Sequence, residues 1–322
     1  MDASAAFPAF VQLNCGTWSG TFYQFNAFGK VLESIQTTME VTSSGTADDL
    51  MMQQRLKVQD QAVGAASASD SESVFDLHSS RTSLGDSQQL SYFPGDGAFS
   101  LSHQTAEALD ALLRKGLSKK KDGEDIDRTV RYPSERPALV SECCLHSDSG
   151  DRRVRAIHVL DTRGLLDQIG VFVESKTEGE ELETQDDPGS RIDALLGKWK
   201  GRASSRRTAL YGGTVTEYDS SITYTKGPEG TLEQVLKMGP SGFELKSTAS
   251  LDGSVILYPG GLQTTLLPGG IAVTCPLNVK PGQSFYFEMS WIVNPGHRSR
   301  LIRTYDLDGL VVSTTLIKEV KS

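Results

Sequence analysis

Hydrophobic and polar positions alternate along much of the chain, and a period of two residues is typical of β-strands with one buried face. Two such runs stand out near the C-terminus. They consist of Phe285, Phe287, Met289 and Trp291, and of Leu310, Val312, Thr314 and Leu316. Turn signals containing Gly and Pro recur across residues 227–309 at intervals of about 8–15 residues, as in all-β folds. The pattern predicts antiparallel β-structure.

A short motif, Gly-x-Trp-x-Gly, occurs twice in the chain. The first copy lies in LNCGTWSGTF and contains Gly16 and Trp18. The second lies in LLGKWKGRAS and contains Gly197 and Trp199, at an offset of 181 residues (197 − 16). Two copies of one strand motif indicate an internal duplication.

A second match supports the duplication. RVRAIHVLDTRGLLDQIGVFVES begins at Arg153, and RSRLIRTYDLDGLVVSTTLIKEV begins at Arg298, with an offset of 145 residues (298 − 153) and no gap. Each copy predicts a strand, an Asp-x-x-Gly turn and a second strand. Because this offset is smaller than the first by 36 residues (181 − 145), the first copy carries additional sequence.

The extra sequence is expected at about residues 104–137, where a run of helix-forming residues leads into a charged loop. We therefore predict a first domain at residues 1–176, an acidic linker at 177–190 and a second domain at 191–322. A short helix is expected before each Gly-x-Trp strand. Ser190 and Asp193 are candidates for a capping box in the second helix.

Each copy has room for about eight to ten antiparallel strands, and a sheet of that length usually closes on itself because closure removes its exposed edges. The predicted fold class is all-β, with two tandem antiparallel β-barrels, each preceded by a short helix, and a helical, charged insertion in the first. A barrel of about eight strands holds one small ligand or fills its interior with side chains.

The repeated motif resembles the lipocalins of the calycin superfamily. In those proteins the Trp of a Gly-x-Trp motif on the first strand packs against an Arg near the last strand and closes the floor of the barrel. The resemblance implies which residues close the floor of each barrel in this chain. They are Gly16, Trp18, Arg153, Arg155, Gly197, Trp199 and Arg298, with Arg300 as an alternative to Arg298.

Over nearly its whole length, the chain also resembles a two-domain lipocalin-like family of cyanobacteria and plastid-bearing eukaryotes. FPGDGAFS, LLPGGIAVTCP and FEMSWIVNPGHRSRLIRTYD carry this resemblance, and segments near 64–73 and 117–137 do not. The family shares its barrel type with the S and T types of phycobiliprotein lyase, which hold an open-chain tetrapyrrole. The resemblance implies a tetrapyrrole-like or lipid-like ligand, and a chloroplast stroma or cyanobacterial-type cytoplasm.

Charge and composition restrict the classes of partner and ligand that we expect for this chain. The net charge is −9, which argues against a nucleic-acid partner. No apolar stretch approaches the roughly 20 residues that span a bilayer, so we expect no integral membrane protein. The four cysteines form no CxxC pair and have no nearby His pair, so we expect no metal site. The N-terminal sequence MDASAAFPAF shows no targeting peptide.

A carboxylate and a guanidinium form the candidate ligand site. Glu288 can meet Arg300 or Arg303 across the turn at Asn294-Pro295-Gly296. Glu142, with Arg153 or Arg155, is the counterpart in the first copy. Such a pair could orient pyrrole nitrogens and bind a propionate. It could equally be a structural ion pair. Glu288 lies in the same predicted strand as Phe287 and Trp291 but on the opposite face. If the aromatic face points into the barrel, Glu288 points outward.

Three functions remain open from the sequence. The leading hypothesis is a carrier for a hydrophobic molecule of the tetrapyrrole, carotenoid or fatty-acid class. The residues predicted to bind it are Trp199, Phe287, Glu288, Trp291, Arg300 and Arg303. The second hypothesis is a bilin lyase or isomerase with Glu288 as its acid. The third is a ligand-free assembly factor that binds a photosynthetic protein through its surface.

Overall fold

The computed structural model describes residues 3–46, 50–59, 71–78, 90–102, 139–177, 182, 186–239, 242–280 and 282–322. The described chain is almost entirely β-structure, and this confirms the predicted fold class. The predicted insertion at about 104–137 lies outside the described residues, as does most of the predicted linker. In the described part of the chain, no helix has the length and apolar character needed to cross a membrane.

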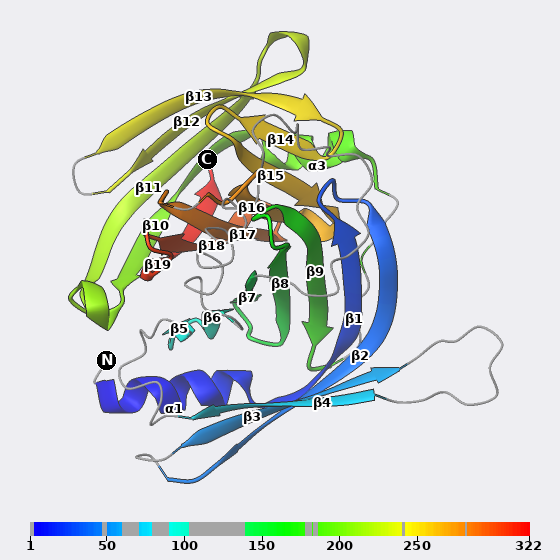
Figure 1. Ribbon diagram of the computed structural model, residues 1–322, viewed down its shortest axis with the longest axis vertical. Coiled ribbons are helices and arrows are strands. Elements are labelled where there is room, and N and C mark those ends of the chain that lie inside the picture. The colour runs from blue at the N-terminus through cyan, green and yellow to red at the C-terminus, as the bar shows by residue number, and fades with distance from the viewer. Residues whose placement is uncertain are drawn as a thin grey trace, which may run out of the picture.

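In its described residues, the first half has one helix and a curled antiparallel sheet (Figure 1). Helix α1 (Ala3–Asn14) precedes the sheet. The strands are β1 (Gly16–Asn26), β2 (Val31–Ser44), β3 (Met51–Gln59), β4 (Ser71–His78), β5 (Leu90–Phe93), β6 (Ala98–Ser102), β7 (Leu139–His146), β8 (Arg152–Leu160) and β9 (Leu166–Ser175). Their order is β4-β3-β2-β1-β9-β8-β7-β6-β5, so β4 and β5 are the two ends of the described sheet.

The second half is a closed barrel in which β10 pairs with β19. Helix α3 (Pro188–Leu195) precedes it. The strands are β10 (Gly197–Arg207), β11 (Val215–Lys226), β12 (Thr231–Met238), β13 (Phe243–Asp252), β14 (Val255–Tyr258), β15 (Leu262–Leu267), β16 (Ile271–Pro276), β17 (Phe285–Asn294), β18 (His297–Tyr305) and β19 (Val311–Lys321). Three 3-10 turns are η2 (Ala209–Tyr211), η3 (Pro228–Gly230) and η4 (Pro268–Gly270).

The predicted capping box of the second helix is wrong. The N-cap of α3 is Asp187, whose side chain makes no capping hydrogen bond. The Ser190 hydroxyl donates to the Asp187 carbonyl at 2.6 Å, and the Asp193 carboxylate pairs with Lys226 at 2.6 Å. Pro188 opens the helix, where its missing N–H costs no hydrogen bond.

The second Gly of each Gly-x-Trp-x-Gly motif allows the first and last strands of each half to approach closely. A Cβ atom on Gly20 would lie 1.9 Å from the Val173 carbonyl oxygen, and one on Gly201 would lie 1.9 Å from the Lys318 carbonyl oxygen. Only Gly fits such an approach. The spacing of the motif is therefore required where β1 meets β9 and where β10 meets β19.

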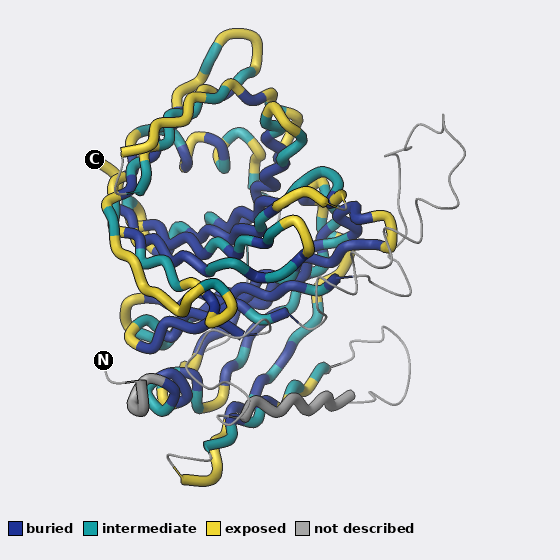
Figure 2. Tube along the Cα trace, turned by 60° about the vertical axis from the view of Figure 1, so that its left-hand side comes forward, coloured by how far each residue is buried: buried dark blue, intermediate teal, exposed yellow. Residues whose placement is uncertain are grey.

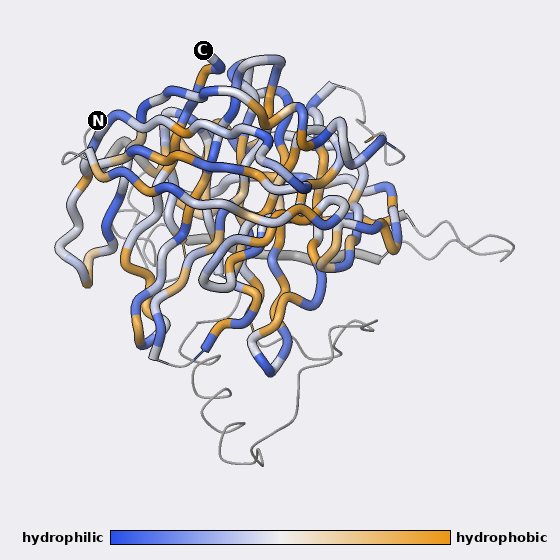
Figure 3. The backbone as a smooth tube through the Cα atoms, turned by 90° about the horizontal axis from the view of Figure 1, so that it is seen from above, coloured by the Kyte–Doolittle hydropathy of each residue, from blue (hydrophilic) through white to orange (hydrophobic). Residues whose placement is uncertain are grey.

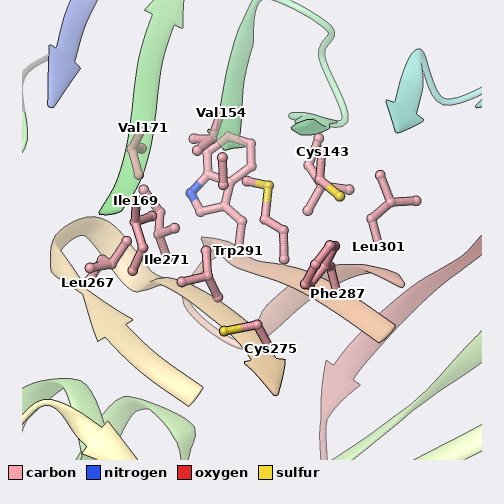
Figure 4. Close-up of a cluster of buried hydrophobic side chains, with 14 of the residues drawn as sticks. Cys143, Val154, Ile169, Val171, Leu267, Ile271, Cys275, Phe287, Trp291 and Leu301 are labelled. Carbon is pink, nitrogen blue, oxygen red and sulfur yellow. The ribbon is translucent and has the colours of Figure 1, made fainter. Parts of the chain in front are cut away.

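The outer faces of the two sheets pack against each other and share one hydrophobic core (Figures 2 and 4). From the first sheet it includes Cys143, Val154, Ile169 and Val171, and from the second Leu267, Ile271, Phe287, Trp291 and Leu301. Seen from above, hydrophobic and hydrophilic positions interleave along the strands (Figure 3). The aromatic face of β17 is thus buried between the barrels, and the opposite face, which carries Glu288, looks into the second barrel.

Each half also has an interior core of its own. Inside the first sheet, Trp18 packs with Phe7, Phe10 and Val11 of helix α1. Inside the second barrel, Trp199 packs with Ile192 and Leu195 of helix α3. Each helix therefore covers the end of the sheet at which the Gly-x-Trp motif lies. Because the two halves share a core, the predicted domain boundaries stay a prediction.

Candidate functional site

A buried Trp forms the floor of each half. Trp18 and Trp199 are both 0% exposed. The Trp18 indole N–H donates to the Asn14 carbonyl at 2.9 Å, and the Trp199 indole N–H donates to the Leu195 carbonyl at 2.8 Å. Both acceptors lie at the C-terminal end of the preceding helix, where carbonyls lack helical partners. The motif thus joins each helix to its barrel.

An Arg from the penultimate strand covers each indole. The Arg153 guanidinium lies 4.1 Å from the ring centroid of Trp18, and the Arg298 guanidinium lies 4.6 Å from that of Trp199. These distances fit cation–π contacts. Gly16 and Gly197 begin the motif strands with φ of 123° and 104°. The floor residues implied by the lipocalin resemblance therefore lie together in both halves.

A buried Glu neutralises each of these Arg residues. Arg153 Nε lies 2.8 Å from Glu174 Oε2, and Arg298 Nε lies 2.7 Å from Glu319 Oε2. Burial alone would raise the pKa of Glu174, but Arg153 and Arg155 lower it below its ordinary value. Sequence reasoning missed both carboxylates, although the ungapped match already paired Glu174 with Glu319.

A second Arg sits two residues further along each penultimate strand. Arg155 contacts Glu174 through Nε at 2.8 Å and Glu142 through Nη1 at 3.0 Å. Arg300 places Nε 2.7 Å from Glu288 Oε1 and Nη2 2.9 Å from Glu288 Oε2. Of the alternatives that the sequence left open, Glu288 thus meets Arg300, and Glu142 meets Arg155.

The Arg300 guanidinium is fully engaged within the chain. Its Nη1 also lies 3.5 Å from Glu319 Oε1. Burial alone would lower the pKa of Arg300, but Glu288 and Glu319 raise it well above its ordinary value. The four charges of Arg298, Arg300, Glu288 and Glu319 cancel. This arrangement stabilises an interior charge network and leaves no uncompensated cation to bind a carboxylate.

Three residues that the sequence proposed for the ligand lie elsewhere. Phe287 stacks on His158 with ring centroids 5.0 Å apart. Trp291 lies 5.8 Å from the Arg152 guanidinium. Arg303 Nη1 donates to the Ser100 carbonyl at 3.0 Å. All three partners belong to the first sheet, so these residues hold the two halves together, and we assign them no ligand contact.

His158 is a buried residue of this interface that the sequence did not single out. It is 0% exposed. Burial lowers its pKa from 6.5 to about 4. Close by, the Tyr305 hydroxyl lies 3.2 Å from the Ser102 hydroxyl. His158 is therefore neutral near pH 7, as an apolar interface requires.

Three tyrosines surround the ion pair inside the second barrel, and sequence reasoning missed them. Tyr224, Tyr258 and Tyr286 come from β11, β14 and β17, and their strand registers place them on the inward face. Burial raises the pKa of all three, and Glu288 adds to the increase. Tyr286 alternates with Phe285 and shares the face of Glu288, which was the signal available in the sequence.

We next consider whether the described cysteines could act as nucleophiles and whether the described residues could bind a metal ion. Burial raises the pKa of Cys143 to about 11 and that of Cys275 to about 12, so neither thiol ionises near pH 7. Among the residues that the structure describes, no group of three or more His, Cys, Asp or Glu side chains could hold a metal ion.

Comparison with known proteins assigns the chain to a family. Residues 4–179 match the N-terminal domain of the DUF3598 family, a domain of unknown function. The chain belongs to the DUF3598 family. Residues 186–322 match a second family, the C-terminal domain of biogenesis factor required for ATP synthase 1. None of the curated proteins compared with this DUF3598 chain matches it.

Two solved structures are similar to the chain to different degrees. A DUF3598 protein of unknown function from Nostoc punctiforme is similar with 22% sequence identity and a TM-score of 0.69, over 98% of each chain. An S-type phycobiliprotein lyase from Guillardia theta is similar with 16% identity and a TM-score of 0.35, over 44% of this chain and 95% of the lyase. The Nostoc punctiforme protein thus shares the fold of this chain over almost its whole length.

Proposed function

We propose that the chain is an assembly factor that binds a subunit of an ATP synthase before the subunit joins the complex. The observation that carries this proposal is the match of residues 186–322 with the C-terminal domain of biogenesis factor required for ATP synthase 1. Of the three functions that the sequence left open, this is the assembly factor, with the ATP synthase as its photosynthetic partner.

The geometry of the second barrel supports a role in protein binding. Leu210, Val215 and Leu307 are 64%, 54% and 57% exposed. The Tyr211 hydroxyl donates to the Asp306 carboxylate and so ties η2, which carries Leu210, to the turn that carries Leu307. We call Leu210, Val215 and Leu307 the apolar rim. Large exposed apolar side chains that lie close together are typical of protein-binding surfaces.

Size-exclusion chromatography of the purified protein mixed with single ATP synthase subunits tests the proposal. We expect a stable complex with at least one subunit. Replacing Leu210 and Leu307 by Asp should weaken this complex at least about tenfold, because desolvated apolar contacts dominate such interfaces. Leu32→Asp is the matched control, since Leu32 is 48% exposed on the other half. If no subunit binds the unaltered protein, the proposal fails.

Carriage of a hydrophobic molecule is a second candidate, and the interior of the second barrel favours it. The register of β12 with β13 places Leu236, Leu245 and Phe243 on the inward face. Leu245 and Phe243 are 45% and 56% exposed there. Mixing the protein with tetrapyrroles, carotenoids and lipids tests this candidate, and a complete lack of saturable binding would exclude it. The lyase alternative is less favoured, since Arg300 holds both carboxylate oxygens of Glu288.

The resemblance to a family of cyanobacteria and plastid-bearing eukaryotes supports a photosynthetic setting. We propose the chloroplast stroma or a cyanobacterial-type cytoplasm as the compartment. A fluorescent fusion of the full-length protein, imaged with chlorophyll autofluorescence, tests this assignment. Fluorescence confined to another compartment would overturn it.

A further inference from the structure

Each half has its own floor of the same Trp and Arg residues, but the side chains further along the strands differ between the halves. In the first half Phe22 pairs with Phe172, and their ring centroids are 4.7 Å apart inside the sheet. The registers put Ala203 and Ile317 at the corresponding places of the second barrel. The first half therefore fills this layer with two aromatic rings, whereas the second has two smaller side chains there.

Polar groups replace apolar ones at the floor and beside the buried Glu. Val41 pairs with Gly16 in the first half, and Tyr224 pairs with Gly197 in the second. Val140 and Tyr286 likewise lie two residues before Glu142 and Glu288. Tyr258 adds a third hydroxyl from β14. The Tyr224 ring belongs to the floor, since the Arg298 guanidinium lies 5.6 Å from its centroid, but the first half keeps its floor without a hydroxyl at the equivalent place.

The three hydroxyls have no hydrogen-bonding partner within the part of the chain that the structure describes. Tyr224 is 8% exposed, and Tyr258 and Tyr286 are half-buried. The hydroxyls keep contact with solvent inside the barrel, so each can donate to an acceptor that enters it. Their position around one interior region therefore suits an acceptor supplied from outside the chain.

The interior around these hydroxyls is open and electrically neutral. Ile302, Tyr258 and Tyr286 face inward in a closed barrel and still keep part of their surface exposed to solvent. Arg300 is already bound by Glu288. A neutral head group that accepts hydrogen bonds suits this site better than a carboxylate, which would lie beside two Glu side chains.

We propose that the second barrel binds a long-chain lipid with an uncharged, hydrogen-bond-accepting head, and that Tyr224, Tyr258 and Tyr286 donate to that head. The aliphatic chain runs along the inward apolar side chains Leu236, Leu245 and Phe243 toward the open end. This inference rests on the second candidate, carriage, and does not depend on the assembly role. It names the class of ligand and the residues that select it.

Isothermal titration calorimetry with two lipids of equal chain length tests the proposal. Monolaurin has a neutral glyceryl ester head, and laurate has a charged head. We expect monolaurin to bind at pH 8 with a Kd at least about tenfold lower than that of laurate, because an unpaired charge is costly to bury. In the Tyr224→Phe, Tyr258→Phe, Tyr286→Phe triple variant, monolaurin binding should weaken at least about tenfold through loss of three hydrogen bonds.

Tyr23→Phe is the control, because it removes a hydroxyl of the first half that accepts from the Leu182 backbone N–H, and it should leave the monolaurin Kd unchanged. Equal binding of both lipids, with no effect of the triple variant, would overturn the head-group site but leave carriage intact. If neither lipid binds, both the site and lipid carriage are overturned. Capture of ATP synthase subunits by the triple variant should equal that of the unaltered protein, which keeps the two functions distinguishable.

Discussion

The Arg300 guanidinium engages both oxygens of the Glu288 carboxylate, at 2.7 Å and 2.9 Å, inside a closed barrel. The two residues are 5% and 9% exposed. Coulombic attraction between buried charges offsets the cost of taking them out of water only while both are present. Loss of either residue therefore destabilises the barrel, even though the intact pair adds little to the free energy of unfolding.

Removing one member of this pair should be costly. Glu288→Gln leaves Arg300 charged with less compensation, and we expect the free energy of unfolding to fall by about 3–5 kcal/mol. Urea denaturation at pH 7 measures the change. The matched control is Glu217→Gln, because Glu217 pairs with Arg202 at the surface, and there we expect a change within about 0.5 kcal/mol. Similar losses in the two variants would contradict the buried network.

Acid should destabilise the fold through His158. Its pKa is about 4 in the folded chain and near 6.5 when unfolded. As the pH falls from about 6.5 to 4, the unfolded chain takes up a proton that the folded chain does not, so stability falls by up to about 3 kcal/mol. His146, whose pKa burial also lowers, acts in the same direction.

Denaturant titrations from pH 7.5 to 4.5 check this prediction. His158→Phe should flatten the decline in stability, and the exposed His297→Phe should not. An unchanged pH profile in the His158 variant would show that this residue is not neutral and buried between the barrels.

The close approach of β10 to β19 predicts a strict requirement for glycine. Gly201→Ala puts a Cβ atom 1.9 Å from the Lys318 carbonyl oxygen, so the strands must separate. We expect a loss above about 3 kcal/mol, comparable to a severe core mutation. A Cβ on Gly95 meets nothing within 4 Å, so Gly95→Ala should be nearly neutral. Thermal denaturation of both variants measures the difference, and equal melting temperatures would refute the prediction.

The shared core predicts that both halves unfold together. Trp291→Ala removes a large side chain that is 5% exposed between the sheets, at an expected cost of about 3–5 kcal/mol. Differential scanning calorimetry should show one transition for the unaltered protein and a loss of that cooperativity in the variant. Two separate transitions in the unaltered protein would mean that the interface contributes little.

Much of the architecture could be predicted from the sequence because it is encoded locally. The duplicated Gly-x-Trp-x-Gly motif and the ungapped Arg-strand match indicated two similar β-halves. The lipocalin resemblance, and not the spacing, implied that each Trp lies near an Arg, and it left Arg155 and Arg300 as alternatives to Arg153 and Arg298. The hairpin likewise left both Arg300 and Arg303 open as partners of Glu288, and the structure decides for Arg300.

The direction in which each face points could not be derived by the same reasoning. Alternation separates Phe287 and Trp291 from Glu288, but it does not say which face meets the lumen. The second barrel buries its aromatic face against the other half, a contact between segments distant in sequence. In FYFEMSWIVN the polar Glu288 and Ser290 alternate with apolar residues, so the strand gives no sign that both of its faces are buried.

The two halves meet through equivalent strands. Strand β7 of the first half lies against both β17 and β18, and β8 lies against β17, while β7 corresponds to β17 and β8 to β18. This is the pseudo-twofold arrangement of a homodimer, realised within one polypeptide. A true homodimer must carry every substitution on both sides of its axis. Here Tyr224 can differ from its counterpart Val41, so one barrel is able to specialise while the other preserves the scaffold.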